Sequence, residues 1–226
     1  MTPDPLIIAL DFDSAAKARA LVKALGTDAG FYKVGMELYA ATGPDFVREL
    51  VGLGKDVFFD MKFYDIPETV KRATAVVART GARFLTVHAS PSIMRAAVEG
   101  RGASALKLLG VTVLTSFDEQ DLGHDGIVCD VPTLVQHRAR HAQLAGMDGV
   151  VASPREAAAL RKTLGPDMLI VTPGVRSSGA NRGDQKRVAT PAEAIRDGAS
   201  YLVIGRQVTR AQDPAGAIRQ IRAEIA

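Results

Sequence analysis

Two acids and a lysine lie close together in the segment DMKFYDIP (residues 60–67), which follows the apolar run VFF (57–59). In a β-strand, residues two positions apart point to the same side, so a strand here places Asp60 and Lys62 on one face. Asp65 then lies beyond that strand, in a turn. These side chains are of the types that act in acid–base chemistry, and their spacing predicts an ion pair at a strand end.

A lone Asp-x-Lys pair is usually a surface salt bridge of little consequence, but the neighbouring apolar runs favour another interpretation. Asp11 follows the run LIIAL (6–10), and Lys33 lies within FYKVG (31–35). The first three apolar runs thus each carry a charge at or near their C-terminal end. Charges at corresponding places of successive strands predict one shared site.

Short apolar runs alternate with stretches of helical periodicity along the chain. Several of the helical stretches begin with a capping residue or with a proline in the first turn. The predicted strands are 6–11, 31–35, 56–61, 83–88, 109–115, 148–152, 168–172 and 200–204. The predicted helices include 14–25, 44–54, 66–81, 91–99, 132–146, 154–164, 191–197 and 214–225.

Near-continuous apolar strands that alternate with helices predict a parallel sheet covered by helices. Eight such units in 226 residues fit a (β/α)₈ barrel, which we predict as a single domain over residues 1–226. An open doubly wound sheet is the alternative. It would use fewer strands, and no Gly-x-Gly-x-x-Gly turn follows the first strand. No linker rich in Pro, Gly or Ser divides the chain.

Composition restricts the kind of partner. The formal net charge is +3, with both signs scattered along the sequence, which argues against a nucleic-acid platform and is compatible with an anionic small substrate. Cys129 is the only cysteine, so no intrachain disulfide can form and a reducing cytoplasm is expected. The N-terminal apolar run is too short for a signal peptide or a membrane span. We therefore expect a soluble cytoplasmic protein.

The loops after the last two predicted strands favour an anion site. Active sites of (β/α)₈ barrels lie at the C-terminal ends of the strands, where the charges of the first three runs are expected to converge. TPGVRSSGANRGDQ (172–185) follows the seventh strand, and IGRQ (204–207) follows the eighth. Singly, each could be a surface connection or a helix start with a solvated arginine. In adjacent units they predict a phosphate site built from backbone N–H groups and arginine.

Seven segments resemble the orotidine 5′-phosphate decarboxylase family, in family order and over nearly the whole chain. They are ALD (9–11), KVG (33–35), DMKFYDIP (60–67), VLTS (113–116), TPGVR (172–176), GDQ (183–185) and VIGR (203–206). The Asp-x-Lys-x-x-Asp core is shared with a wider superfamily, and its combination with the other segments makes the resemblance strong. ASPS (89–92) departs from the pattern, because it lacks the glycine pair of many bacterial members.

The resemblance implies decarboxylation of orotidine 5′-monophosphate to uridine 5′-monophosphate, the last step of de novo pyrimidine synthesis, with neither a metal nor an organic cofactor. Lys62 would lie beside C6 of the pyrimidine and deliver a proton there. Asp60 would lie beside the substrate carboxylate. Lys33 and Asp65 would complete an alternating array that keeps Lys62 protonated and in place.

The resemblance also implies a homodimer, because the residues that match Asp65, Ile66 and Thr69 reach the active site of the partner subunit. No nucleic acid or membrane partner is expected. The remaining matched residues would bind the substrate: Asp11 at the ribose hydroxyls, Thr115 and Ser116 at the pyrimidine edge, Gln185, Arg206 and the Gly205 N–H at the phosphate, and Pro173 and Arg176 in the loop that closes over it.

Two other functions stay open. Relatives that act on 3-keto sugar phosphates share the Asp-x-Lys-x-x-Asp core but use Mg²⁺ and an acid on the second strand. This chain has Lys33 on that strand, with Glu37 just beyond it. Alternatively, a nucleotide-binding module that has lost catalysis would bind through Gln185 and Arg206 alone.

One histidine pair has the spacing of a metal site. His137 and His141 are four residues apart, as in helical metal pairs. The glutamate and the third ligand that accompany such pairs are missing from the sequence nearby. We therefore interpret the pair as part of a solvated helix face.

Overall fold

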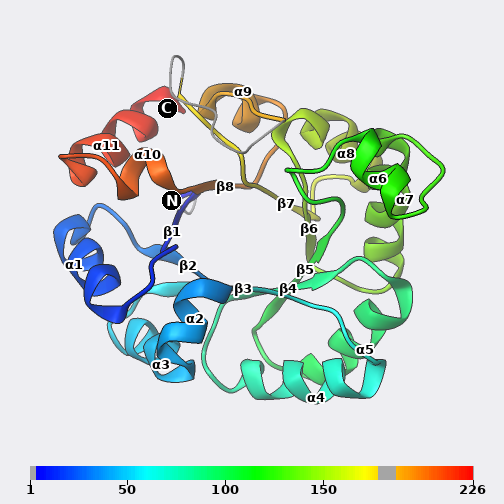
Figure 1. Ribbon diagram of the computed structural model, residues 1–226, viewed down its shortest axis with the longest axis horizontal. Coiled ribbons are helices and arrows are strands. Elements are labelled where there is room, and N and C mark those ends of the chain that lie inside the picture. The colour runs from blue at the N-terminus through cyan, green and yellow to red at the C-terminus, as the bar shows by residue number, and fades with distance from the viewer. Residues whose placement is uncertain (1–3, 178–186, 226) are drawn as a thin grey trace.

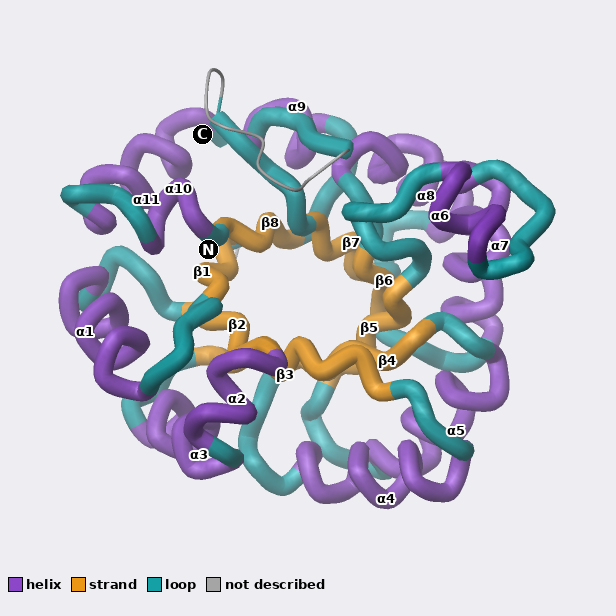
Figure 2. Tube along the Cα trace, in the orientation of Figure 1, coloured by secondary structure: helices purple, strands orange, loops and turns teal. Residues whose placement is uncertain are grey.

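A closed barrel of eight parallel strands forms the centre of the computed structural model, which describes residues 4–177 and 187–225. Each strand pairs with the next in chain order, and β1 closes the barrel against β8 through Leu6↔Leu202 and Ile8↔Ile204. Helices surround this ring on the outside (Figures 1 and 2). The predicted (β/α)₈ barrel is therefore confirmed, because an open sheet would leave β1 and β8 unpaired.

The elements alternate as the sequence indicates. The strands are β1 (Leu6–Ala9), β2 (Phe31–Gly35), β3 (Asp56–Phe63), β4 (Phe84–His88), β5 (Lys107–Val111), β6 (Gly149–Val151), β7 (Leu169–Thr172) and β8 (Tyr201–Ile204). The helices are α1 (Ala15–Leu25), α2 (Met36–Thr42), α3 (Pro44–Gly52), α4 (Pro67–Ala78), α5 (Pro91–Arg101), α6 (Glu119–His124), α7 (Val131–Leu144), the 3₁₀ helix η1 (Pro154–Glu156), α8 (Ala157–Leu164), α9 (Pro191–Arg196), α10 (Arg206–Thr209) and α11 (Pro214–Glu224).

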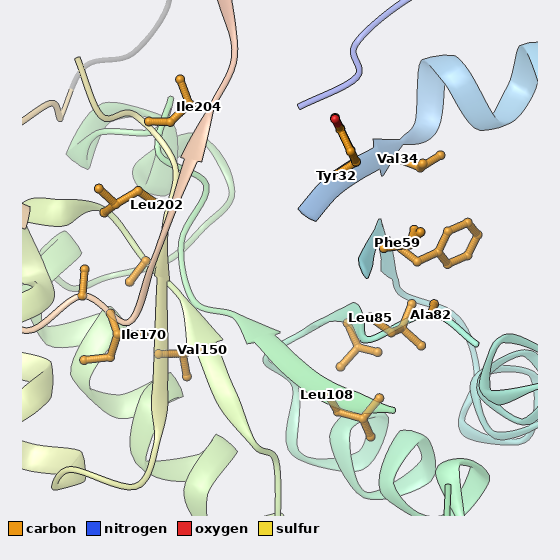
Figure 3. Packing of buried hydrophobic residues seen from close by; sticks show 14 of the residues in the cluster. Tyr32, Val34, Phe59, Ala82, Leu85, Leu108, Val150, Ile170, Leu202 and Ile204 are labelled. Atoms are coloured by element: carbon orange, nitrogen blue, oxygen red, sulfur yellow. The ribbon is translucent and has the colours of Figure 1, made fainter. Parts of the chain in front are cut away.

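Strand residues alternate between two apolar layers. Tyr32, Phe59 and Leu85 belong to the layer between strands and helices, part of which Figure 3 shows. Phe31 and Phe58 belong to the second layer, which fills the barrel itself. Because both faces of each strand are buried, the strands read as continuous apolar runs rather than as alternating ones.

An arginine and aromatic rings close the N-terminal end of the barrel. Arg83 precedes β4, and its guanidinium lies over the rings of Phe31, Phe84 and Tyr201 at 5.3, 5.6 and 5.7 Å. It also donates to the Tyr201 hydroxyl and pairs with Asp56. All four partners are the first residues of their strands. This end is therefore a packed floor.

Three short helices, α2, α6 and α10, were not among the predicted elements, and most strand bounds differ by one or two residues, those of β5 by more. β5 ends at Val111 rather than at residue 115. The N–H and hydroxyl of Thr112 both donate to the Val151 carbonyl, and Phe117 N–H bonds to the Leu114 carbonyl in a turn. The segment VLTS (113–116) is thus a loop above the barrel, although its apolar residues resemble a strand.

No helix in the described ranges is long and apolar enough to cross a bilayer.

Candidate active site

Four charged side chains form a continuous chain of ion pairs at the C-terminal ends of β1, β2 and β3. Lys33 Nζ lies 2.8 Å from Asp11 Oδ1 and 3.7 Å from Asp60 Oδ2. Lys62 Nζ lies 2.9 Å from Asp60 Oδ1. The structure therefore brings together the charges that the sequence placed on three successive strands.

Strand alternation places the inner members of this chain above the barrel core. Lys33 follows Phe31 by two residues, and Asp60 follows Phe58 by two residues, so each shares the inward face of its strand. Their side chains are 10% and 12% exposed, whereas that of Asp11 is 58% exposed. The array is thus buried at Lys33 and Asp60 and open to solvent at Asp11.

Burial and ion pairing oppose each other in this array, and pairing prevails. Burial alone would raise the pKa of the Asp60 carboxyl, but the ammonium groups of Lys33 and Lys62 hold that pKa below its ordinary value. Burial alone would lower the pKa of Lys33, yet Asp60 and Asp11 raise it above its ordinary value. Both Lys33 and Asp60 are therefore charged at neutral pH.

The backbone of β3 is irregular where it carries the site. Its register against β4 shifts between Phe59 and Phe63. Lys62 has a φ of 49°, and it is the only non-glycine residue in the described ranges with a positive φ. Such a conformation costs roughly 1–2 kcal/mol. Despite this irregularity, the ion pair that the sequence predicted for Asp60 and Lys62 forms at the end of β3.

Asp65 is the predicted array member that this chain does not place in the array. It lies exposed in the turn after β3, where its Oδ1 accepts a hydrogen bond from the Ile66 N–H. Ile66 is 66% exposed, and Thr69 lies half-buried in the first turn of α4. None of these three residues forms a hydrogen bond or ion pair with the array within the described part of the chain.

A cavity of about 460 Å³ opens beside the array, between the ends of β1, β2, β7 and β8. Asp11 and Lys33 line one side of it. The other side includes several predicted substrate-binding residues, namely Pro173, Arg176, Gly205 and Arg206. Arg176 is buried, and Arg206 opens the short helix α10 directly after Gly205. The cavity is therefore basic at the end where the phosphate site was predicted. Gln185 lies outside the described residues.

The loop after β5, which carries Thr115 and Ser116, does not line this cavity. Thr115 is buried and Ser116 is half-buried. The Leu114 carbonyl, in the same loop, accepts a hydrogen bond from Arg187 Nη2 at 2.9 Å. Arg187 Nη1 in turn lies 2.6 Å from Glu156 Oε1 in a buried ion pair. Burial raises the pKa of Glu156 even though Arg187 opposes it.

Sequence reasoning missed Thr86, Glu156 and Arg187. Thr86 is fully buried in β4, where its hydroxyl donates to Asp60 Oδ1 and accepts from the Lys62 N–H. A threonine in an apolar strand is ordinary, so nothing in the sequence marks it. The charges of Glu156 and Arg187 are 31 residues apart, and no local pattern joins them.

The rings of His137 and His141 on α7 have centroids 4.4 Å apart and planes tilted by 59°, and His137 is exposed. Across the described ranges, no group of three or more His, Cys, Asp or Glu side chains is placed to hold a metal ion. The exposure of His137 is as expected for a solvated helix face.

Buried charges of alternating sign at the C-terminal mouth of a (β/α)₈ barrel, next to a basic cavity, are the arrangement expected of an active site in an enzyme of this fold. The family model described as "Orotidine 5′-phosphate decarboxylase / HUMPS family" matches residues 4–221, and the chain belongs to this family. The predicted family is thereby confirmed.

Individual relatives agree with this assignment. A protein of Rhodopseudomonas palustris named orotidine 5′-phosphate decarboxylase is 54% identical over 99% of this chain and 94% of its own length. One of Nitrobacter winogradskyi with the same name is 53% identical over 99% of this chain and 93% of its own. The crystal structure of the enzyme so named from Lactobacillus acidophilus superimposes with a TM-score of 0.86 at 36% identity, covering 98% of both chains.

Proposed function

We propose that this chain decarboxylates orotidine 5′-monophosphate to uridine 5′-monophosphate, using neither a metal nor an organic cofactor. Family membership and the names of its relatives support the reaction. The observation that carries the proposal is the chain of ion pairs from Asp11 through Lys33 and Asp60 to Lys62. The reaction needs such a preorganised array, for the following reason.

Loss of CO₂ from C6 leaves an electron pair in the plane of the pyrimidine ring, where the π-system cannot delocalise it. Stabilisation must therefore come from charges fixed in place before the reaction. The Lys62 ammonium is a compact cation that also carries a proton. When the C6–carboxylate bond breaks, the electron pair stays on C6, and a proton moves there from Nζ. Solvent then reprotonates the amine, which fits a side chain that is 27% exposed.

Asp60 and Lys33 set the charge around this step. Asp60 is ionised and buried, so it faces the substrate carboxylate as a like charge and disfavours the bound carboxylate relative to the carbanion. Lys33 lies on the far side of Asp60 and keeps that carboxylate ionised. Asp11, at the exposed end of the array, is available to the ribose hydroxyls.

The cavity lining fits the rest of the nucleotide. Arg206 and the Gly205 N–H border it and would bind the phosphate, together with Gln185. Pro173 and Arg176 would lie in the loop that closes over the phosphate. Thr115 and Ser116 would bind the pyrimidine edge. Binding at the phosphate, remote from C6, would then contribute to the rate by positioning the ring.

A homodimer would complete the array. Asp65 is exposed, and its neighbours Tyr64 and Ile66 are 71% and 66% exposed. Large apolar side chains exposed side by side in one turn are typical of surfaces that another protein covers. A second copy could cover them and receive Asp65 beside its own Lys62.

We place this enzyme in the cytoplasm, with one catalytic domain over residues 1–226, in keeping with a single, exposed free cysteine, Cys129.

Lys62→Ala tests the proposed proton donor. The wild-type protein should convert orotidine 5′-monophosphate, followed by ultraviolet absorbance and by CO₂ release. Lys62→Ala should lose roughly 10⁴-fold or more in kcat, because proton transfer and charge stabilisation are lost together. Its affinity for uridine 5′-monophosphate, measured by calorimetry, should stay within a few-fold of wild type. Near-normal turnover by the variant would rule out Lys62 as the donor.

Mixing two inactive variants tests the shared site. A heterodimer of Lys62→Ala and Asp65→Ala subunits contains one site with neither change, if Asp65 acts in the partner's site. Activity should therefore recover on mixing, toward one functional site per heterodimer. Each variant mixed with itself is the control. No recovery despite heterodimers demonstrated by native mass spectrometry would show that each subunit uses its own Asp65.

A further inference from the structure

We propose that Thr86 is a positioning residue of this active site: its hydroxyl orients the Asp60 carboxylate and holds the Lys62 backbone in its left-handed conformation. The functional part of this inference rests on the proposed decarboxylation, whereas its structural part can be tested without any substrate. Thr86 belongs to β4 and is fully buried. Its hydroxyl forms hydrogen bonds with two members of the array on the neighbouring strand β3.

The directions of its two hydrogen bonds are fixed by the partners. The Lys62 N–H can only donate, and it does so to Thr86 Oγ1 at 2.9 Å. The ionised Asp60 carboxylate can only accept, and Thr86 Oγ1 donates to its Oδ1 at 2.8 Å. A hydroxyl carries one proton, so that of Thr86 is committed to Asp60. One side chain thus joins the backbone of one array member to the carboxylate of another.

The β3–β4 register explains why Thr86 is the residue in this place. Phe59 pairs with Leu85 and Phe63 pairs with Val87, so the residues 60–62 of β3 lie opposite Thr86 alone. The strands cannot pair all of these backbone groups. The Thr86 hydroxyl accepts the Lys62 N–H that the register shift would otherwise leave without a strand partner. A buried N–H without an acceptor is costly, and that cost would add to the cost of the left-handed conformation itself.

The second bond fixes the carboxylate. Asp60 Oδ1 receives Thr86 Oγ1 at 2.8 Å and Lys62 Nζ at 2.9 Å, while Oδ2 lies 3.7 Å from Lys33 Nζ. Donors on β2, β3 and β4 therefore define its orientation from three sides. Without Thr86, the carboxylate keeps its two cations but is free to turn about its Cβ–Cγ bond, and Lys62 Nζ is free to follow.

Thr86→Val and Thr86→Ser separate positioning from packing. Valine keeps the branched shape and loses both hydrogen bonds, whereas serine keeps the hydroxyl and loses a methyl group. Thr112→Val is the matched control, because Thr112 is another buried threonine, beyond the end of β5, whose hydroxyl donates to the Val151 carbonyl. If Thr86→Val does not fold, Thr86→Ala takes its place.

The first readout is amide hydrogen exchange at Lys62, which needs no substrate. Exchange in Thr86→Val should be at least about 10-fold faster than in wild type, since a hydrogen bond contributing about 1.4 kcal/mol is worth that factor. Exchange in Thr86→Ser should stay within about 3-fold of wild type. Unchanged exchange in Thr86→Val would overturn the structural part of the proposal, whatever the enzyme does.

The second readout is steady-state kinetics with orotidine 5′-monophosphate. In Thr86→Val, kcat should fall on the order of 10²-fold, the scale of a misplacement near 1 Å, with KM within a few-fold of wild type. Thr86→Ser should recover most of kcat, and Thr112→Val should keep it. Wild-type kcat in Thr86→Val, or an equal loss in Thr86→Ser, would overturn the positioning role. An inactive wild type would instead count against the proposed function, and the exchange result would still stand.

Discussion

Lys33 is the residue through which the array is held together. Its side chain is buried, and its ammonium group pairs with Asp11 on one side and with Asp60 on the other. Removing one member of such a cluster would leave an uncompensated buried charge, which is strongly destabilising. Small displacements of Lys33 are therefore a gentler way to test the array than its removal.

Gly35→Ala should displace Lys33 while leaving the fold intact. Gly35 has φ −98° and ψ −174°, which alanine adopts freely, but a Cβ there would lie 2.9 Å from Lys33 Nζ. The ammonium must shift, so kcat should fall roughly 10-fold with little change in Tm. Gly30→Ala, just before the same strand, is the control, because a Cβ at Gly30 would have open space around it. Equal kcat in both variants would show that the position of Lys33 is not critical.

At this scale the sequence revealed charges but not the groups that orient them. Asp11, Lys33, Asp60 and Lys62 could be predicted because charged residues at the ends of apolar runs are rare and face one end of a barrel. The left-handed backbone of Lys62 could not be predicted, because nothing in DMKFY marks an irregular strand. The role of Thr86 could not be predicted either, since it depends on the register between β3 and β4.

Close contacts between elements depend on small residues at a few positions. Helix α5 lies against α4, and Gly100 near the end of α5 meets the backbone of Lys71 in α4. A Cβ at Gly100 would lie 2.1 Å from the Lys71 carbonyl oxygen. That distance cannot be accommodated without moving one helix. Gly100 therefore fixes how closely the two helices approach.

Gly100→Ala should lower stability although alanine is the better helix former. The gain in helix propensity is about 1 kcal/mol, but separating two packed helices costs typically 1–3 kcal/mol or more. Tm should fall, as measured by calorimetry. Gly123 lies in helix α6, and a Cβ there would have open space around it. Gly123→Ala should therefore leave Tm unchanged or raise it. A rise in both variants would mean that α4 and α5 can separate freely.

Helices were predictable where the periodic stretch was long and a capping residue or a proline marked its start. The capping box of Thr190 and Glu193 opens α9 at Pro191, the residue where the predicted helix 191–197 begins. β5 was placed too late, because Val113 and Leu114 extend its apolar run although the chain turns away after Thr112. The helices α2, α6 and α10 are only four to seven residues long, too short for periodicity to show.

Across the whole molecule, the barrel separates stability from chemistry. The charged array lies at the C-terminal ends of the strands, and Arg83 with its three rings closes the N-terminal ends. In (β/α)₈ barrels, the floor contributes to stability and the mouth to catalysis. The closed barrel itself was predictable from eight alternating units.

Arg83→Met should lower stability without affecting turnover. Methionine keeps the length of the side chain but loses the pair with Asp56, the bond to Tyr201 and the cation–π contacts. Each is worth roughly 0.5–1 kcal/mol at a partly exposed site, so the free energy of unfolding should fall by about 2 kcal/mol in a urea titration. Arg95→Met, on the exposed face of α5, is the control. A loss of kcat in Arg83→Met would mean that floor and mouth are coupled.

The most direct test of the central claim is turnover of orotidine 5′-monophosphate by protein treated with EDTA and freed of metal. We predict that the protein forms uridine 5′-monophosphate and CO₂ at the same rate before and after EDTA, and that added Mg²⁺ changes nothing. Folded protein that is silent without metal and regains activity with Mg²⁺ would contradict the claim. It would direct attention to Glu37, which lines the same cavity as Lys33, and to sugar-phosphate chemistry.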